Sequence, residues 1–70
     1  MRRSPVSSSV IASVGYAHDT EVMEIEFVSG AVYRYRGVSP DVYEDFCDAP
    51  SKGTFFNAHI KNAYLWEQVK

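Results

Sequence analysis

The sequence has little of what usually crosslinks a very small domain: one cysteine, Cys47, and two histidines in 70 residues. A single cysteine cannot form an internal disulfide, and no Cys/His set has the spacing of a zinc site. No run of residues approaches the roughly 20 apolar positions of a membrane span. After Arg2 and Arg3 there is no apolar segment typical of a signal peptide, so we expect a cytoplasmic protein without membrane association.

Hydrophobic residues make up 46% of the chain and aromatic residues 14%, which favours a folded protein over a disordered one. A chain of this length has room for one small domain, which buries only about 60% of its unfolded surface. An aromatic core or self-association must therefore replace crosslinks. We expect residues 1–6 to be a flexible N-terminus and residues 7–70 to form the single domain.

The net charge of −2 is unevenly distributed along the chain. One short segment contains four acidic residues: Asp41, Glu44, Asp45 and Asp48. Residues 51–70 instead carry three lysines against one glutamate. The overall acidity argues against a strongly basic nucleic-acid binder, but a basic face can coexist with an acidic one.

Alternation of apolar and polar residues predicts three strands, near Ser9–Tyr16, Glu21–Val28 and Ala31–Arg36. A three-residue loop, 28–30, in which Gly30 takes a left-handed conformation, aligns the last two strands so that their polar residues share one face and their apolar residues the other. We call these the wet and the dry face of the sheet. This register pairs Ile25 with Tyr33, Met23 with Tyr35 and Glu24 with Arg34.

Two helices and a final strand are expected after this hairpin. Ser39-Pro40-Asp41 is typical of a helix start, and Pro50 ends that helix at about Ala49. Ser51 can cap a second helix over about residues 53–61, and the aromatic and branched content of residues 64–69 suggests an edge strand. The expected fold is α+β, in the order β-β-β-α-α-β, with both helices packed on one face of an antiparallel sheet.

Short elements throughout the chain occur in a recognisable order. They are Ser8-Ser9-x-Ile11, Gly15-Tyr16, the strand 24–27, Gly30, Tyr33-x-Tyr35, Gly37-Val38, Val42-Tyr43, Ala49-x-Ser51-x-Gly53, Phe55-Phe56-Asn57 and Ile60. Together they resemble the KTSC domain, which occurs free-standing in bacteria and at the C-terminus of some lysyl-tRNA synthetases. The resemblance covers about residues 7–69. It implies no assigned function, and the attachment to a tRNA-handling enzyme suggests RNA as a ligand.

Tyr33-Arg34-Tyr35-Arg36 is the principal candidate contact for RNA, because aromatic rings stack on bases and guanidiniums bind phosphates. The alternation argument favours a structural role for the two rings, which share a face with the apolar residues of the preceding strand. Arg34 and Arg36 then lie on the wet face, where Glu24 partly neutralises them together with Glu26.

Two lysines complete the candidate nucleic-acid site. Lys52 lies in Ser51-Lys52-Gly53-Thr54, where backbone N–H groups at a helix start could bind a phosphate, although capping alone explains Ser51. Lys61 comes at the end of the same helix. The predicted nucleic-acid-binding residues are Arg34, Arg36, Lys52, Lys61, Tyr33 and Tyr35.

Catalysis is not expected from this sequence. Acidic neighbours and a position near a helix C-terminus disfavour the thiolate of Cys47, which we expect to be half-buried and unreactive. His18 and His59 lack further ligands at metal-binding spacing, and no Gly-x-Ser-x-Gly motif is present. We predict no enzyme activity, no metal and no cofactor.

Two functions remain open. The chain is predicted to be a small non-enzymatic module that binds RNA. The alternative is a protein-interaction or self-assembling module, in which a sheet edge or exposed aromatics such as Phe55 and Trp66 contact another protein or a second copy. A continuous basic strip would favour RNA, and an apolar patch ringed by polar groups would favour a protein partner.

Overall fold

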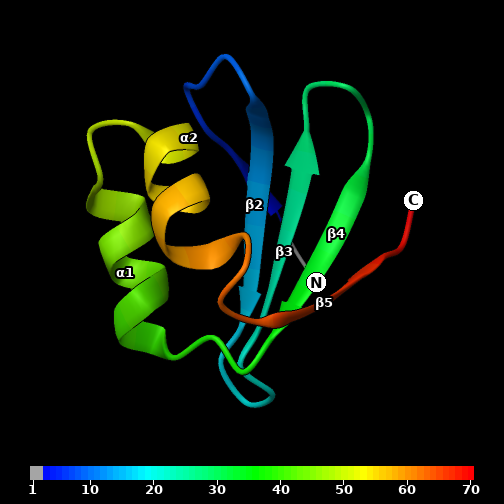
Figure 1. Cartoon of the computed structure of the whole chain (residues 1–70), viewed down its shortest axis with the longest axis vertical. Helices are drawn as coiled ribbons and strands as arrows, with labels where there is room; N and C mark the ends of the chain where they lie inside the picture. Colours follow the sequence, from blue (N-terminus) through cyan, green and yellow to red (C-terminus); the bar gives the residue numbers. More distant parts are fainter. Residues whose placement is uncertain (1–2) are drawn as a thin grey trace.

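The computed structural model describes residues 3–70, which contain one antiparallel sheet of five strands (Figure 1). The strands are β1 (Arg3–Pro5), β2 (Ile11–Ala17), β3 (Val22–Phe27), β4 (Val32–Arg36) and β5 (Leu65–Gln68). Their order in the sheet is β1-β2-β3-β4-β5, so every strand pairs with its neighbours in sequence. Only the connection from β4 to β5 is long, and it contains the helices.

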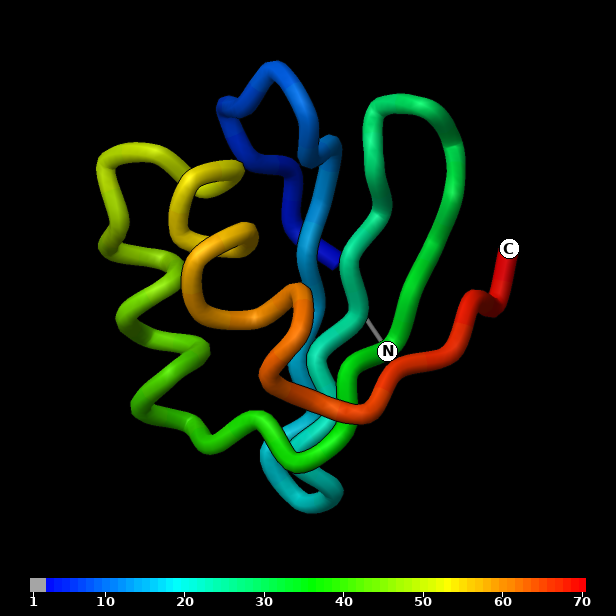
Figure 2. Tube along the Cα trace, in the orientation of Figure 1, coloured from blue at the N-terminus to red at the C-terminus, as the bar shows by residue number. Residues whose placement is uncertain are grey.

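The helical segments are α1 (Pro40–Asp48), α2 (Lys52–Phe55) and a π-helical turn, η1 (Phe56–Ile60), which continues α2. The chain leaves β4, passes through these segments on one side of the sheet and returns beside β4 as β5 (Figure 2). The predicted α+β class, with both helices on one face of an antiparallel sheet, is confirmed.

The predicted hairpin register is also confirmed. Ile25 pairs with Tyr33, Met23 with Tyr35 and Glu24 with Arg34. The N–H of Phe27 donates to the carbonyl of Ala31 at 2.8 Å, which closes the three-residue loop, and Gly30 has a φ of 98°. Glycine adopts this left-handed conformation without the steric cost that a side chain would add.

Both helix starts follow the capping residues that the sequence indicates. The side chain of Ser39 accepts the N–H of Val42 at 3.3 Å, and that of Ser51 accepts the N–H of Thr54 at 3.3 Å. The second helix differs from the expectation in its last turn, where the N–H of Lys61 donates to the carbonyl of Phe56 at 2.9 Å. This i→i−5 bond defines the π-turn. Apolar residues have nearly the same spacing in a single π-turn as in an α-helix, so the sequence does not reveal the difference.

The N-terminal strand β1 was not predicted, since we expected residues 1–6 to be flexible. Arg3 pairs with Gly15 and Pro5 with Ser13, so the element order begins with one additional strand. Three residues are too few to show a periodic pattern, and β1 depends on the edge that β2 offers. Residues 1 and 2 lie outside the described part of the chain, and for them the expectation stays a prediction.

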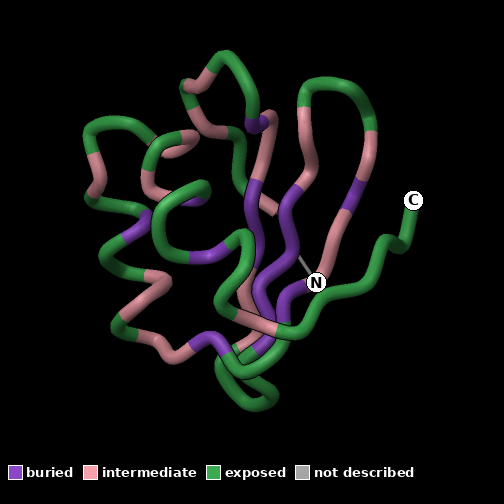
Figure 3. Tube along the Cα trace, in the orientation of Figure 1, coloured by how far each residue is buried: buried purple, intermediate pink, exposed green. Residues whose placement is uncertain are grey.

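The core lies between the sheet and the helices (Figure 3). Met23, Ile25 and Tyr35 from the sheet are buried there with Phe46 and Ile60 from the helical side. This packing confirms that the dry strand face meets both helices. Cys47 is exposed, so our expectation of a half-buried thiol was wrong. Because successive helical residues are about 100° apart, the turn that buries Phe46 directs the next side chain away from the core.

Candidate functional site: an aromatic groove

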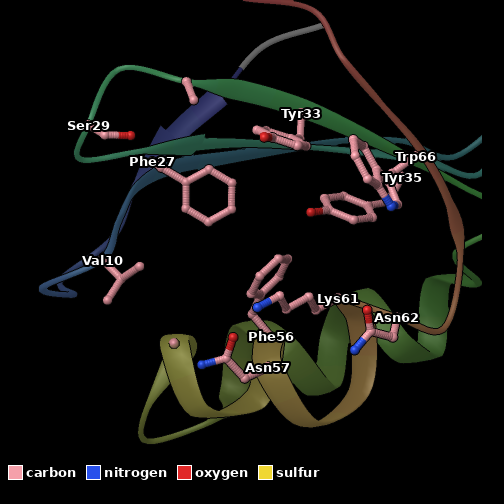
Figure 4. Close-up of a pocket in the computed structure, with 12 residues that line it drawn as sticks. Val10, Phe27, Ser29, Tyr33, Tyr35, Phe56, Asn57, Lys61, Asn62 and Trp66 are labelled. Atoms are coloured by element: carbon pink, nitrogen blue, oxygen red, sulfur yellow. The ribbon is translucent and has the colours of Figure 1, made fainter.

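A groove of about 430 Å³ opens between the sheet and the η1 turn (Figure 4). One wall comes from the sheet and carries aromatic side chains, and the other comes from the helical segments and carries amides and a lysine. The principal lining residues are Phe27, Tyr33, Tyr35, Phe56, Asn57, Lys61, Asn62 and Trp66. A pocket of this size is at the lower end of the range for small-molecule sites.

Strand register brings the aromatic rings together. Tyr35 lies opposite Trp66 in the β4–β5 pair, and the rings of Tyr33 and Trp66 have centroids 5.2 Å apart. Phe27 meets Tyr33 edge-to-face at 5.6 Å and Phe56 at 5.4 Å. Such geometries are the favoured ones for aromatic pairs, and they hold the wall of the groove in place. Trp66 is 55% exposed and therefore presents ring surface to a ligand.

The hydroxyl of Tyr35 supplies a polar group deep in the groove. The residue is only 3% exposed, and its hydroxyl points into the open space between the two walls (Figure 4). None of the side-chain hydrogen bonds formed within residues 3–70 uses this hydroxyl. Burial, with a smaller contribution from the neighbouring Tyr33, raises the pKa of Tyr35 to about 12. The hydroxyl therefore stays protonated at neutral pH and can donate to a ligand.

The groove is positively charged on balance. Lys61 is the one charged residue among those that line it, and no aspartate or glutamate does so. The acidic residues of α1 are far from this opening, since α1 lies at the left of Figure 1 and β4 and β5 at the right. An anionic ligand would thus approach Lys61 without meeting a carboxylate at the groove itself.

The structure brings three of the six predicted site residues together. Tyr33, Tyr35 and Lys61 line the groove, where Tyr35 also belongs to the core as the alternation argument predicts. Arg34 and Arg36 lie on the opposite face of the sheet, because they alternate with the tyrosines along β4. Lys52 lies outside the groove, and its ammonium donates to the carbonyl of Ala49 at 2.6 Å.

Acidic side chains neutralise the arginine face. The five strands contain three arginines and three glutamates, all on the face away from the helices. Glu24 is buried, with 6% of the whole residue exposed. Its carboxylate contacts Arg34 at 2.9 Å and Arg3 at 3.1 Å. Arg36 pairs with Glu67 of β5. The interleaved carboxylates mean that Arg34 and Arg36 do not form the continuous basic strip that would favour RNA binding at this face of the sheet.

Sequence reasoning missed several groove residues, namely Phe27, Phe56, Asn57, Asn62 and Trp66 as parts of one site. The first two were assigned to the core, and Trp66 to a protein contact. Asn57 and Lys61 have the i, i+4 spacing of one helical face, which was the only available signal that they could act together.

No group of three or more His, Cys, Asp or Glu side chains within residues 3–70 could hold a metal ion. None of the described helices has the length and apolar character needed to cross a bilayer.

The fold and groove together define a small α+β domain with an open sheet face and an aromatic site under its helices. The KTSC domain family matches residues 7–64, which is most of the chain. The protein belongs to the KTSC domain family. The crystal structure of a KTSC domain protein from Yersinia pestis has a TM-score of 0.96 with this chain at 40% identity, covering 99% of this chain and 97% of the other.

Relatives in sequence fall into two kinds. An uncharacterized protein of Stutzerimonas stutzeri is 41% identical over 61 residues, which cover 87% of this chain and 86% of the relative. A lysine–tRNA ligase of Nostoc punctiforme is 48% identical over 61 residues, again 87% of this chain but only 11% of the ligase. The similarity to the ligase thus covers a small part of that protein, and no catalytic family is indicated for the domain.

Proposed function

We propose that this KTSC domain is a non-enzymatic RNA-binding module and that RNA binds at the aromatic groove. The observation that carries the proposal is the set of side chains there: exposed ring surface of Trp66, the half-buried ring of Tyr33 and the ammonium of Lys61. Stacking on aromatic rings and pairing of phosphates with cations are the two interactions by which proteins hold single-stranded RNA. Such a role would place the protein in the cytoplasm.

The relatives also favour an RNA-binding role. A lysine–tRNA ligase contains a segment similar to this chain, and an RNA-binding role would suit a domain joined to such an enzyme. The neutral arginine face makes a smaller contribution in this proposal, because Glu24 and Glu67 already pair with its guanidiniums. We therefore expect the groove to account for most of the affinity.

Titration with a single-stranded RNA of about 12 nucleotides tests this function, a length within the range of sites on small single-strand binders. Trp66 is the sole tryptophan, so its fluorescence reports binding at the groove. We expect Lys61→Ala to weaken binding and to reduce the slope of log K against log salt by about 0.7, the contribution of one phosphate contact. Circular dichroism should stay unchanged, because Lys61 is exposed.

Arg36→Ala is the matched control, since it also removes one exposed cation and Arg36 does not line the groove. It should change the affinity less than Lys61→Ala does. An equal loss would mean that phosphates also contact the sheet face, as the sequence predicts for Arg34 and Arg36. Absence of binding at low salt, where electrostatic attraction is strongest, would reject RNA as the ligand.

Self-association is a second candidate, favoured by the exposed edge strand β5. All four of its residues are exposed, and Leu65 is 80% exposed at the outer edge of the sheet. An exposed edge with apolar side chains can pair with the same edge of a second copy. Sedimentation should then show a dimer that Leu65→Lys dissociates, whereas Val28→Lys, in the hairpin loop, should leave it intact. A monomer at all concentrations would reject this candidate.

A further inference from the structure

The aromatic residues of the groove surround one space instead of forming a row. Phe56 contacts Phe27 at a centroid distance of 5.4 Å and Tyr35 at 5.5 Å, while Tyr33 contacts Phe27 and Trp66. Figure 4 shows these rings on the sides of a single opening. A platform for several stacked bases would instead need successive exposed rings along the surface. The volume of about 430 Å³ also suits one small ligand.

The polar groups of the groove complement a base and a phosphate. The side-chain amides of Asn57 and Asn62 can each donate and accept hydrogen bonds, as the edge of a nucleobase requires. The Tyr35 hydroxyl, on a side chain that is almost fully buried, adds a donor that no side-chain hydrogen bond within residues 3–70 uses. Lys61 lies on the same wall as the amides and offers a point charge to a phosphate.

We infer that the groove is a pocket for a single unstacked nucleotide. The base lies against Trp66 and Tyr33, its polar edge meets the Tyr35 hydroxyl and the two amides, and its phosphate pairs with Lys61. This inference rests on the proposed RNA-binding function and deepens it by fixing the unit of recognition at one nucleotide. An apolar peptide side chain suits the groove less well, because it would cover the hydroxyl of Tyr35 without offering it a hydrogen-bond partner.

Mononucleotides test the inference directly. We expect UMP or AMP, added to the full chain at up to about 10 mM, to change the fluorescence of Trp66 in a saturable way, since a single base gives weak affinity. Ribose 5-phosphate carries the same phosphate without a base and should bind at least about fivefold weaker, the factor that corresponds to the lower end of the about 1–3 kcal/mol that base–aromatic stacking is worth.

Two variants distinguish the roles of the polar groups. Tyr35→Phe keeps the ring in the core and removes only the hydroxyl, so it should weaken nucleotide binding about 3- to 10-fold while the melting temperature changes little. Lys61→Ala should weaken UMP but leave the affinity for uridine unchanged, since uridine has no phosphate. Both variants should retain the circular dichroism spectrum of the unsubstituted protein.

The outcomes separate this inference from the function on which it rests. If the 12-nucleotide RNA binds while mononucleotides do not, or if both variants bind UMP as the unsubstituted protein does, the one-nucleotide pocket is wrong and RNA binding stands. Equal affinity for ribose 5-phosphate and UMP would also overturn the pocket, because the base would then contribute nothing. If neither RNA nor nucleotides bind, both proposals fall, and a protein ligand for the groove becomes the remaining interpretation.

Discussion

Replacing Phe56 by alanine is expected to lower the free energy of unfolding by about 3 to 5 kcal/mol, the usual cost of removing a phenylalanine side chain from a core. Phe56 is 6% exposed and belongs to the main core cluster, where its ring meets Phe27 and Tyr35 edge-to-face. A domain of this size has a small total stability, so such a loss is a large fraction of it. Urea denaturation followed by circular dichroism measures the change.

Phe55→Ala is the matched control, since it removes the same side chain from the preceding position. Phe55 is half-buried and contacts Phe46 at a centroid distance of 6.0 Å from the rim of the core. We expect its substitution to cost clearly less than that of Phe56. Equal losses for the two variants would contradict the core that the structure assigns to Phe56.

Local signals explain why so much of the fold could be predicted. The alternation of apolar and polar residues along β3 and β4 indicated which residues face the helices. The odd number of residues in the loop around Gly30 indicated how the two strands pair. Ser39 and Pro40 placed the start of α1 because capping depends on only a few neighbouring residues. Strand β1 and the π-turn could not be predicted, because one depends on the edge of β2 and the other on a single shifted hydrogen bond.

The candidate site was predictable only in part, because part of it depends on contacts between segments that are distant in the sequence. Strand parity correctly placed Arg34 opposite Glu24 on the wet face, but the contribution of Arg3 depends on β1 and was missed. Tyr33 and Lys61 were chosen individually for their chemistry. Their common groove arises from the packing of η1 against the β3–β4 hairpin and β5, which no local sequence pattern contains.

Removing the charge of the buried carboxylate of Glu24 is expected to cause the second large loss of stability. Its two oxygens contact the guanidiniums of Arg3 and Arg34, and only 8% of its side chain is exposed. Glu24→Gln keeps the shape but removes the charge: the amide oxygen can accept from only one guanidinium, and the amide NH2, itself a donor, faces the other one. We expect the free energy of unfolding to fall by about 1 to 3 kcal/mol, below the 3–5 kcal/mol typical of a broken buried pair, because both arginines can turn toward solvent.

Glu26→Gln makes the same chemical change two residues along β3 and serves as the matched control. Glu26 is half-buried and accepts a hydrogen bond from the Ser13 hydroxyl at 2.8 Å, which an amide oxygen can still accept. Its substitution should therefore change stability by less than about 1 kcal/mol. Since the Glu24 pairs join β1, β3 and β4, Glu24→Gln should also speed exchange of the Arg3 and Ser4 amide hydrogens in β1, an edge strand that pairs with β2 at three positions. Unchanged exchange in β1, together with equal stabilities of the two variants, would show that the Arg3–Glu24–Arg34 cluster does not hold the N-terminal strand to the sheet.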